Sequence, residues 1–129
     1  MIVTISAIVF SILMGVLILF QLCLTLGMPW GEASMGGKYP GKYPPKMRFV
    51  SLLNSFILSI IAIIVLVKAD IVLPHLKPVS NIAIYFVVGF SAVATILNTI
   101  TTSKIERKIW APVAMVLLIT SIIIAFVST

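Results

Sequence analysis

Long hydrophobic stretches without a single charge alternate with short charged segments along the chain. The charge-free stretches are residues 1–31, 49–67, 78–103 and 109–129. A helix that crosses the roughly 30 Å hydrocarbon core of a bilayer needs about 20 apolar residues, and a charge at its centre costs about 2.5–3.5 kcal/mol. The pattern therefore predicts four membrane-spanning helices, at about residues 2–26, 46–68, 80–101 and 104–127.

Proline, serine and glutamate residues mark several ends of these helices. Pro45 suits the first turn of the second helix, where a missing N–H costs little. Ser80 is the expected N-cap of the third helix. Ser103 and Glu106 have the spacing of a capping box ahead of the fourth, which gives Glu106 a structural role.

The composition supports the same fold. Hydrophobic residues make up 61% of the 129 residues and charged residues 9%, and a soluble domain of this size could not bury so much apolar surface. The first stretch lacks the basic n-region of a signal peptide, so we interpret it as a mature helix. The expected fold is an all-α membrane protein, a four-transmembrane-helix bundle that forms one domain over residues 1–129.

Small or hydroxyl residues recur at helical spacing in each span. Helices in lipid pack through such residues and through interhelical hydrogen bonds, so we expect these faces to point inward in a bundle or to form a homodimer seam. The faces contain Thr4, Ala7, Ser11, Gly15 and Thr25; Ser51, Asn54, Ser55, Ser59 and Ala62; Ser91, Thr95, Asn98, Thr99 and Thr102; and Ala111, Ala114, Ser121, Ala125 and Ser128.

Basic residues are concentrated in the first and third connections. The positive-inside rule places the side richer in lysine and arginine in the cytoplasm, so loops 27–45 and 102–108 are expected there and both termini outside. The basic residues of that side are Lys38, Lys42, Lys46, Arg48, Lys104, Arg107 and Lys108, against Lys68 and Lys77 on the other.

The first loop, residues 27–45, is rich in glycine, proline and aromatic residues. Gly-Lys-Tyr-Pro occurs twice in tandem, at 37–40 and 41–44. Tryptophan and tyrosine are favoured at the headgroup level, and lysines attract anionic lipids. We expect either an ordered loop anchored at the interface or a lid over the cytoplasmic mouth of the bundle. Its candidate contact residues are Trp30, Lys38, Tyr39, Lys42 and Tyr43.

Two segments carry a resemblance. The first runs from Gly27-Met28-Pro29-Trp30-Gly31 through Gly36-Gly37 to Pro44, Pro45 and Arg48; the second contains Asn98, Ser103, Glu106-Arg107 and Trp110-Ala111-Pro112-Val113. Over most of its length the chain resembles a group of small bacterial four-helix membrane proteins. The resemblance implies a bacterial plasma-membrane protein and implies no activity, substrate or catalytic residue.

Residues with catalytic or ligating chemistry are few. The acids are Glu32, Asp70 and Glu106, with His75 and Cys23 as the other candidate ligands. Metal sites need such residues in clusters, so we expect neither a metal nor a cofactor. Phosphate-binding motifs are absent from the sequence, and the basic residues flank spans instead of forming a nucleic-acid-binding patch. We expect Arg48 and Arg107 to pair with Glu32 and Glu106, and Asp70 to offset Lys68.

Gln21, Asn54 and Asn98 are the most polar residues within the spans. All three are expected in the cytoplasmic half. They either bond across helices, because an unpaired polar group in hydrocarbon is costly, or line a small polar cavity beneath the first loop.

Three functions fit these observations. The leading hypothesis is a non-enzymatic membrane protein, an accessory component that interacts with a protein partner or with anionic lipid headgroups. The second is a small transporter or channel that acts as a homo-oligomer. The third is a membrane enzyme that uses Glu32, Glu106 and Arg107 at the cytoplasmic headgroup level.

Overall fold

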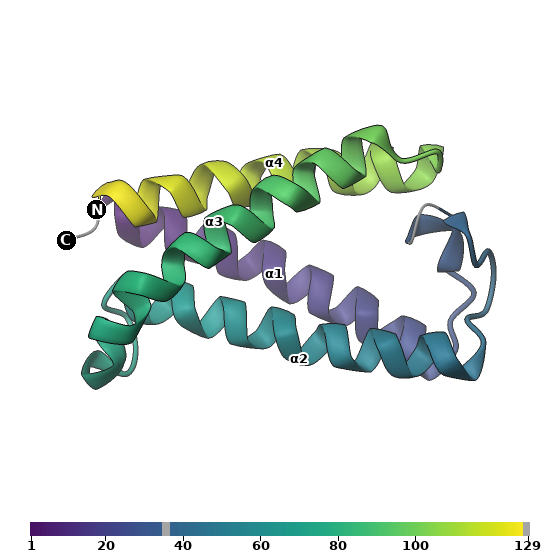
Figure 1. The fold of residues 1–129 in the computed structure, drawn as a ribbon, viewed down its shortest axis with the longest axis horizontal. Coiled ribbons are helices and arrows are strands. Elements are labelled where there is room, and N and C mark those ends of the chain that lie inside the picture. Colours follow the sequence, from purple (N-terminus) through teal and green to yellow (C-terminus); the bar gives the residue numbers. More distant parts are fainter. Residues whose placement is uncertain (35–36, 128–129) are drawn as a thin grey trace.

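The chain folds into four long helices that are joined by short connections (Figure 1). The structure is a computed structural model and describes residues 1–34 and 37–127; Gly36, Ser128 and the side chain of Glu32 lie outside the described part. All four helices are long and apolar enough to cross a membrane, so the expected all-α bundle of an integral membrane protein is confirmed. The helices are α1 (Ile2–Leu26), α2 (Pro45–Lys68), α3 (Lys77–Ile100) and α4 (Lys104–Val127), with short 3-10 turns η1 (Gly31–Ala33) and η3 (Pro74–Leu76).

Helix α3 begins earlier than its expected start at residue 80. Its first residue is Lys77, because Pro78 is accepted in the first helical turn. Ser80 is therefore inside the helix and does not cap it. Its hydroxyl donates to the carbonyl of Lys77 at 2.8 Å.

The helices form two hairpins that diverge towards one end. Helix α1 packs mainly on α2 and α3 mainly on α4, while α2 and α3 share fewer contacts. Figure 1 shows the α1–α2 pair separating from the α3–α4 pair towards the first loop. The main core fills the opposite half, where Phe10, Met14, Ile84 and Ile124 have no exposed surface. The bundle is thus closed at one end and wedge-shaped at the other.

The small-residue faces are partly inside the bundle. Several of their hydroxyl groups bond along their own helices: Ser55 donates to the carbonyl of Ser51 at 3.0 Å, and Thr95 to that of Ser91 at 2.8 Å. Small volume, more than bonding across helices, therefore accounts for these faces. Buried members are Ala7, Ser51, Ser55, Ser91, Ala114, Ser121 and Ala125, whereas Thr4, Thr99 and Thr102 are exposed.

Asp70 interacts electrostatically with Lys68, as expected, but its ion pair in the connection between α2 and α3 is with another lysine. Asp70 pairs with Lys77 at 3.0 Å, and Lys77 also donates to the Lys68 carbonyl at 2.6 Å. Lys68 also donates to the side-chain oxygen of Asn81 at 2.7 Å. Lys77 and Asn81 at the start of α3 thus both contact the end of α2.

Candidate functional site

A cavity of about 630 Å³ occupies the wedge between the two hairpins, next to the first loop. Its lining is mostly apolar, with polar side chains in a minority. All four helices and the first loop contribute. The lining residues are Leu17, Phe20, Gln21, Ala33, Ser34, Asn54, Ile57, Leu58, Phe90, Ser91, Val93, Ala94, Leu97, Asn98, Ile100, Thr101, Thr102, Glu106, Trp110, Val113, Ala114 and Leu117.

The most exposed part of the apolar lining lies on α2 and α3. The exposed apolar side chains in the lining belong to these two helices: Ile57 on α2, and Phe90, Val93, Leu97 and Ile100 on α3. The same two helices are the least closely packed neighbours of the bundle. We infer that the cavity opens between these two helices, on a side that faces lipid chains in a bilayer.

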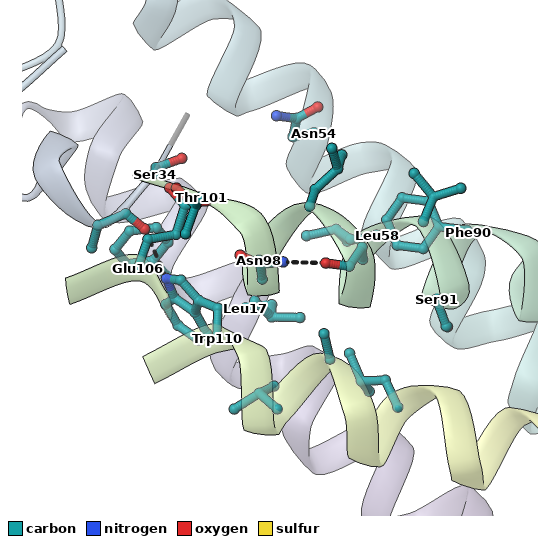
Figure 2. Close-up of a pocket in the computed structure, with 18 of the residues that line it drawn as sticks. Leu17, Ser34, Asn54, Leu58, Phe90, Ser91, Asn98, Thr101, Glu106 and Trp110 are labelled. Carbon is teal, nitrogen blue, oxygen red and sulfur yellow. Dashed lines mark hydrogen bonds between the residues drawn. The ribbon is translucent and has the colours of Figure 1, made fainter. Parts of the chain in front are cut away.

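Each helix contributes one strongly polar side chain to the lining: Gln21 from α1, Asn54 from α2, Asn98 from α3 and Glu106 from α4. The Asn98 amide nitrogen donates to the Ala94 carbonyl at 2.7 Å (Figure 2). This hydrogen bond lies within α3 and does not join two helices. The sequence singled out all four residues, and the structure brings them to one cavity.

Glu106 combines two positions, one in a helix cap and one in the cavity. Its backbone N–H donates to the Ser103 hydroxyl at 3.2 Å, which is one half of the expected capping box. Its side chain is buried, and Figure 2 shows it with Ser34 and Thr101 at one end of the cavity. Leu58 and Phe90 lie towards the other end. The cavity therefore has a polar end near the loop and an apolar end deeper in the bundle.

The first loop covers the polar end of the cavity. Ala33 and Ser34 line it from the loop side, and the indole N–H of Trp110 donates to the Ala33 carbonyl at 2.9 Å. Phe20 packs between two tryptophans, with ring centroids 4.9 Å from Trp110 and 6.4 Å from Trp30. One buried hydrogen bond and one aromatic cluster thus fasten the loop to the bundle.

The loop folds back on itself at Gly31. The Gly31 N–H donates to the Gly41 carbonyl at 2.9 Å, and a Cβ at this position would lie 1.9 Å from the Tyr39 carbonyl oxygen. Only glycine fits so close an approach. Tyr43 is buried against Leu24 and Met47, and burial raises the pKa of its phenol, a shift that the nearby Ser34 hydroxyl opposes.

The basic candidates of the first and third connections lie outside the cavity lining. Arg48 donates to the Thr25 carbonyl at 2.7 Å and Arg107 to the Thr101 carbonyl at 3.1 Å. These guanidinium groups thus bind carbonyls at helix ends; of the acids expected to pair with them, the Glu32 side chain lies outside the described part. Lys38 lies 5.6 Å from the ring centroid of Tyr39.

The sequence did not single out Phe20, Ser34, Ser91 or Trp110 as site residues. Phe20 and Trp110 belong to residue types that also fill cores, so composition carries no signal for them. Ser91 is 1% exposed, and its hydroxyl has no hydrogen-bond partner among the described residues.

The polarity of the cavity suits an amphipathic ligand. Glu106 is the one ionisable side chain among the described lining residues. No group of three potential metal ligands occurs among the described residues. A cavity that is apolar at one end and polar at the other matches an amphipathic molecule.

A comparison of the chain with protein-family models, with curated proteins and with solved structures finds no match.

Proposed function

We propose that this chain is a non-enzymatic membrane protein of a bacterial plasma membrane that holds a membrane amphiphile in its side-open cavity. The observation that carries the proposal is the opening between α2 and α3, which is lined by the exposed side chains of Ile57, Val93, Leu97 and Ile100. A lipid chain that leaves the bilayer through this opening keeps an apolar environment throughout. Its polar group then reaches the amide and carboxyl side chains beneath the loop.

The proposed orientation places the first loop in the cytoplasm and Met1 outside, by the distribution of basic residues. The polar end of the cavity then lies at the depth of the cytoplasmic headgroups. Lysines and arginines around this end attract the anionic lipid surface. In this proposal the loop acts as a lid that Trp110 holds in place.

Lipid that co-purifies with the protein tests the proposal. Ala94 lines the cavity, and Ala94→Phe would fill part of it. Ile96 is two residues away, 58% exposed and not part of the lining, so Ile96→Phe is the matched control. Native mass spectrometry after mild detergent extraction should show a several-fold loss of bound lipid in Ala94→Phe alone. Equal occupancy in wild type and both variants would refute the proposal.

Transport is the second candidate, because four helices each send one polar side chain to the cavity. The fully buried core around Phe10, Met14, Ile84 and Ile124 fills the other half of the bundle, so a pathway would need a second copy or another conformation. Liposome flux assays with wild type and Asn98→Ala discriminate between the two functions. Solute flux that Asn98→Ala abolishes would favour transport over binding alone.

A further inference from the structure

We propose that the cavity selects amphiphiles with a positively charged head, such as a lipid-soluble amine, quaternary ammonium or phosphonium ion. This inference rests on the proposed binding function and names its ligand class. It follows from the juxtaposition of one buried carboxylate, three carboxamides and aromatic rings around a cavity whose described lining contains no lysine, arginine or histidine.

Glu106 determines which sign of ligand charge the cavity favours. Its side chain is 7% exposed, and a charge removed from water acts on a neighbouring ion far more strongly than an exposed one does. An anionic head would meet this carboxylate with no basic side chain among the described lining residues. A cationic head is attracted at the same place.

Aromatic rings and carboxamides complete a cation site. Phe20 and Trp110 line the cavity, and the faces of aromatic rings attract cations within about 6 Å. The Asn98 amide nitrogen is engaged by the Ala94 carbonyl, which leaves its oxygen as the atom to face a ligand. Gln21 and Asn54 each add a carboxamide, whose oxygen is an acceptor for a cationic head.

The basic residues in the loops at the same end of the bundle repel a cationic head group, but their effect inside the cavity is weaker. Lys104, Arg107 and Lys108 are exposed, and charges in water are screened over about 8 Å at physiological salt. Arg107 is the nearest of them along the chain, and its guanidinium bonds to the carbonyl of Thr101, which lies beside Glu106 at the polar end of the cavity. These residues attract anionic lipid to the outer surface, while Glu106 controls the interior.

Two hydrophobic ions of nearly the same shape and opposite charge test the selectivity. Tetraphenylphosphonium and tetraphenylborate would be titrated calorimetrically into the full-length protein in neutral maltoside micelles. Wild type should bind the phosphonium at least about tenfold more tightly than the borate, a modest ratio for a charge contact at partial burial. Tighter or equal binding of the borate would overturn the inference.

Two substitutions that each remove one negative charge test whether Glu106 is the source of the preference for the phosphonium ion. Glu106→Gln keeps the capping box, which accepts either residue at this position, and should abolish the preference for the phosphonium. Asp70 lies at the other end of the bundle, 68% exposed, at a φ of 62° that asparagine tolerates. Asp70→Asn should keep the preference; a preference that survives in Glu106→Gln, or that Asp70→Asn also loses, contradicts the assignment.

The lipid measurement separates this inference from the function on which it rests. If Ala94→Phe loses co-purifying lipid but wild type binds both ions alike, the cavity binds amphiphiles and the charge selectivity is wrong. If Ala94→Phe changes neither lipid nor ion binding, the binding function itself is wrong.

Discussion

The hydrogen bond between Trp110 and Ala33 joins residues 77 positions apart in the chain. It is buried, and it is the contact through which α4 holds the first loop over the cavity. Leaving a buried carbonyl without its donor costs about 1–3 kcal/mol. The position of the loop therefore depends strongly on this single indole.

Trp110→Phe should loosen the loop while leaving the helices in place. The phenylalanine keeps an aromatic ring beside Phe20 but cannot donate to the Ala33 carbonyl. Hydrogen exchange in detergent should accelerate at the amides of Ala33 and Ser34, whose donors bond within the turn. Trp30→Phe is the control, since Trp30 is 42% exposed and its indole donates no hydrogen bond to the described residues. Unchanged exchange in Trp110→Phe would show that the bond does not hold the loop.

Alanine substitutions at Gly31 and Gly15 should differ in their effect on stability. Gly31→Ala would place a methyl group against two backbone carbonyls, of Tyr39 and Gly41, and backbone cannot yield as a side-chain tip does. Gly15 lies inside α1 with nothing within 4 Å of an added Cβ, so Gly15→Ala should be neutral or stabilising by about 0.5–1 kcal/mol. Unfolding in detergent checks both. A Gly31→Ala protein as stable as wild type would contradict the described loop.

Tyr43 makes the loop sensitive to high pH. Its phenol is buried, which raises its pKa above the ordinary value of 10.0. The folded loop therefore favours the protonated phenol, so its stabilisation is complete below pH 10 and is lost as the pH rises through the higher pKa of the folded state. Limited proteolysis between pH 9 and 11 should show the loop opening. Tyr43→Phe should remove this response and Tyr39→Phe should keep it; an identical response in all three proteins would exclude Tyr43 as its source.

At the scale of elements, the spans could be predicted from the sequence almost completely. Uninterrupted hydrophobic runs and proline positions fix the ends of α1, α2 and α4 to within one residue. The start of α3 was harder, because Ser80 has the type of an N-cap while Pro78 is equally acceptable inside the first turn. Local sequence supports both starts, and the contacts of Lys77 and Asn81 with the end of α2 accompany the earlier one.

The candidate site could be predicted only in part. Gln21, Asn54 and Asn98 stand out because polar side chains are rare in spans, and each was expected near the first loop. That they share one cavity with Glu106 depends on the divergence of the two hairpins, which arises from side-chain packing between distant segments. The Trp110–Ala33 contact also depends on packing between distant segments, so no local sequence pattern predicts it.

At the scale of the whole molecule, the bundle is asymmetric along its long axis. One half is filled by a packed core, and the other holds a cavity that the first loop covers and that α2 and α3 leave open at the side. In lipid, this arrangement exposes a partly polar interior to the bilayer. The proposed function requires lipid chains to reach that interior.

Quenching of Trp110 fluorescence by brominated lipid measures whether lipid chains reach the cavity. The chain has two tryptophans, so Trp30→Phe leaves Trp110, which is 9% exposed and lines the cavity, as the sole emitter. In bilayers of lipid brominated near the ester end of the chains, we predict strong quenching that Ala94→Phe reduces and Ile96→Phe does not. Equal Trp110 emission in brominated and ordinary lipid would show that lipid does not reach the cavity.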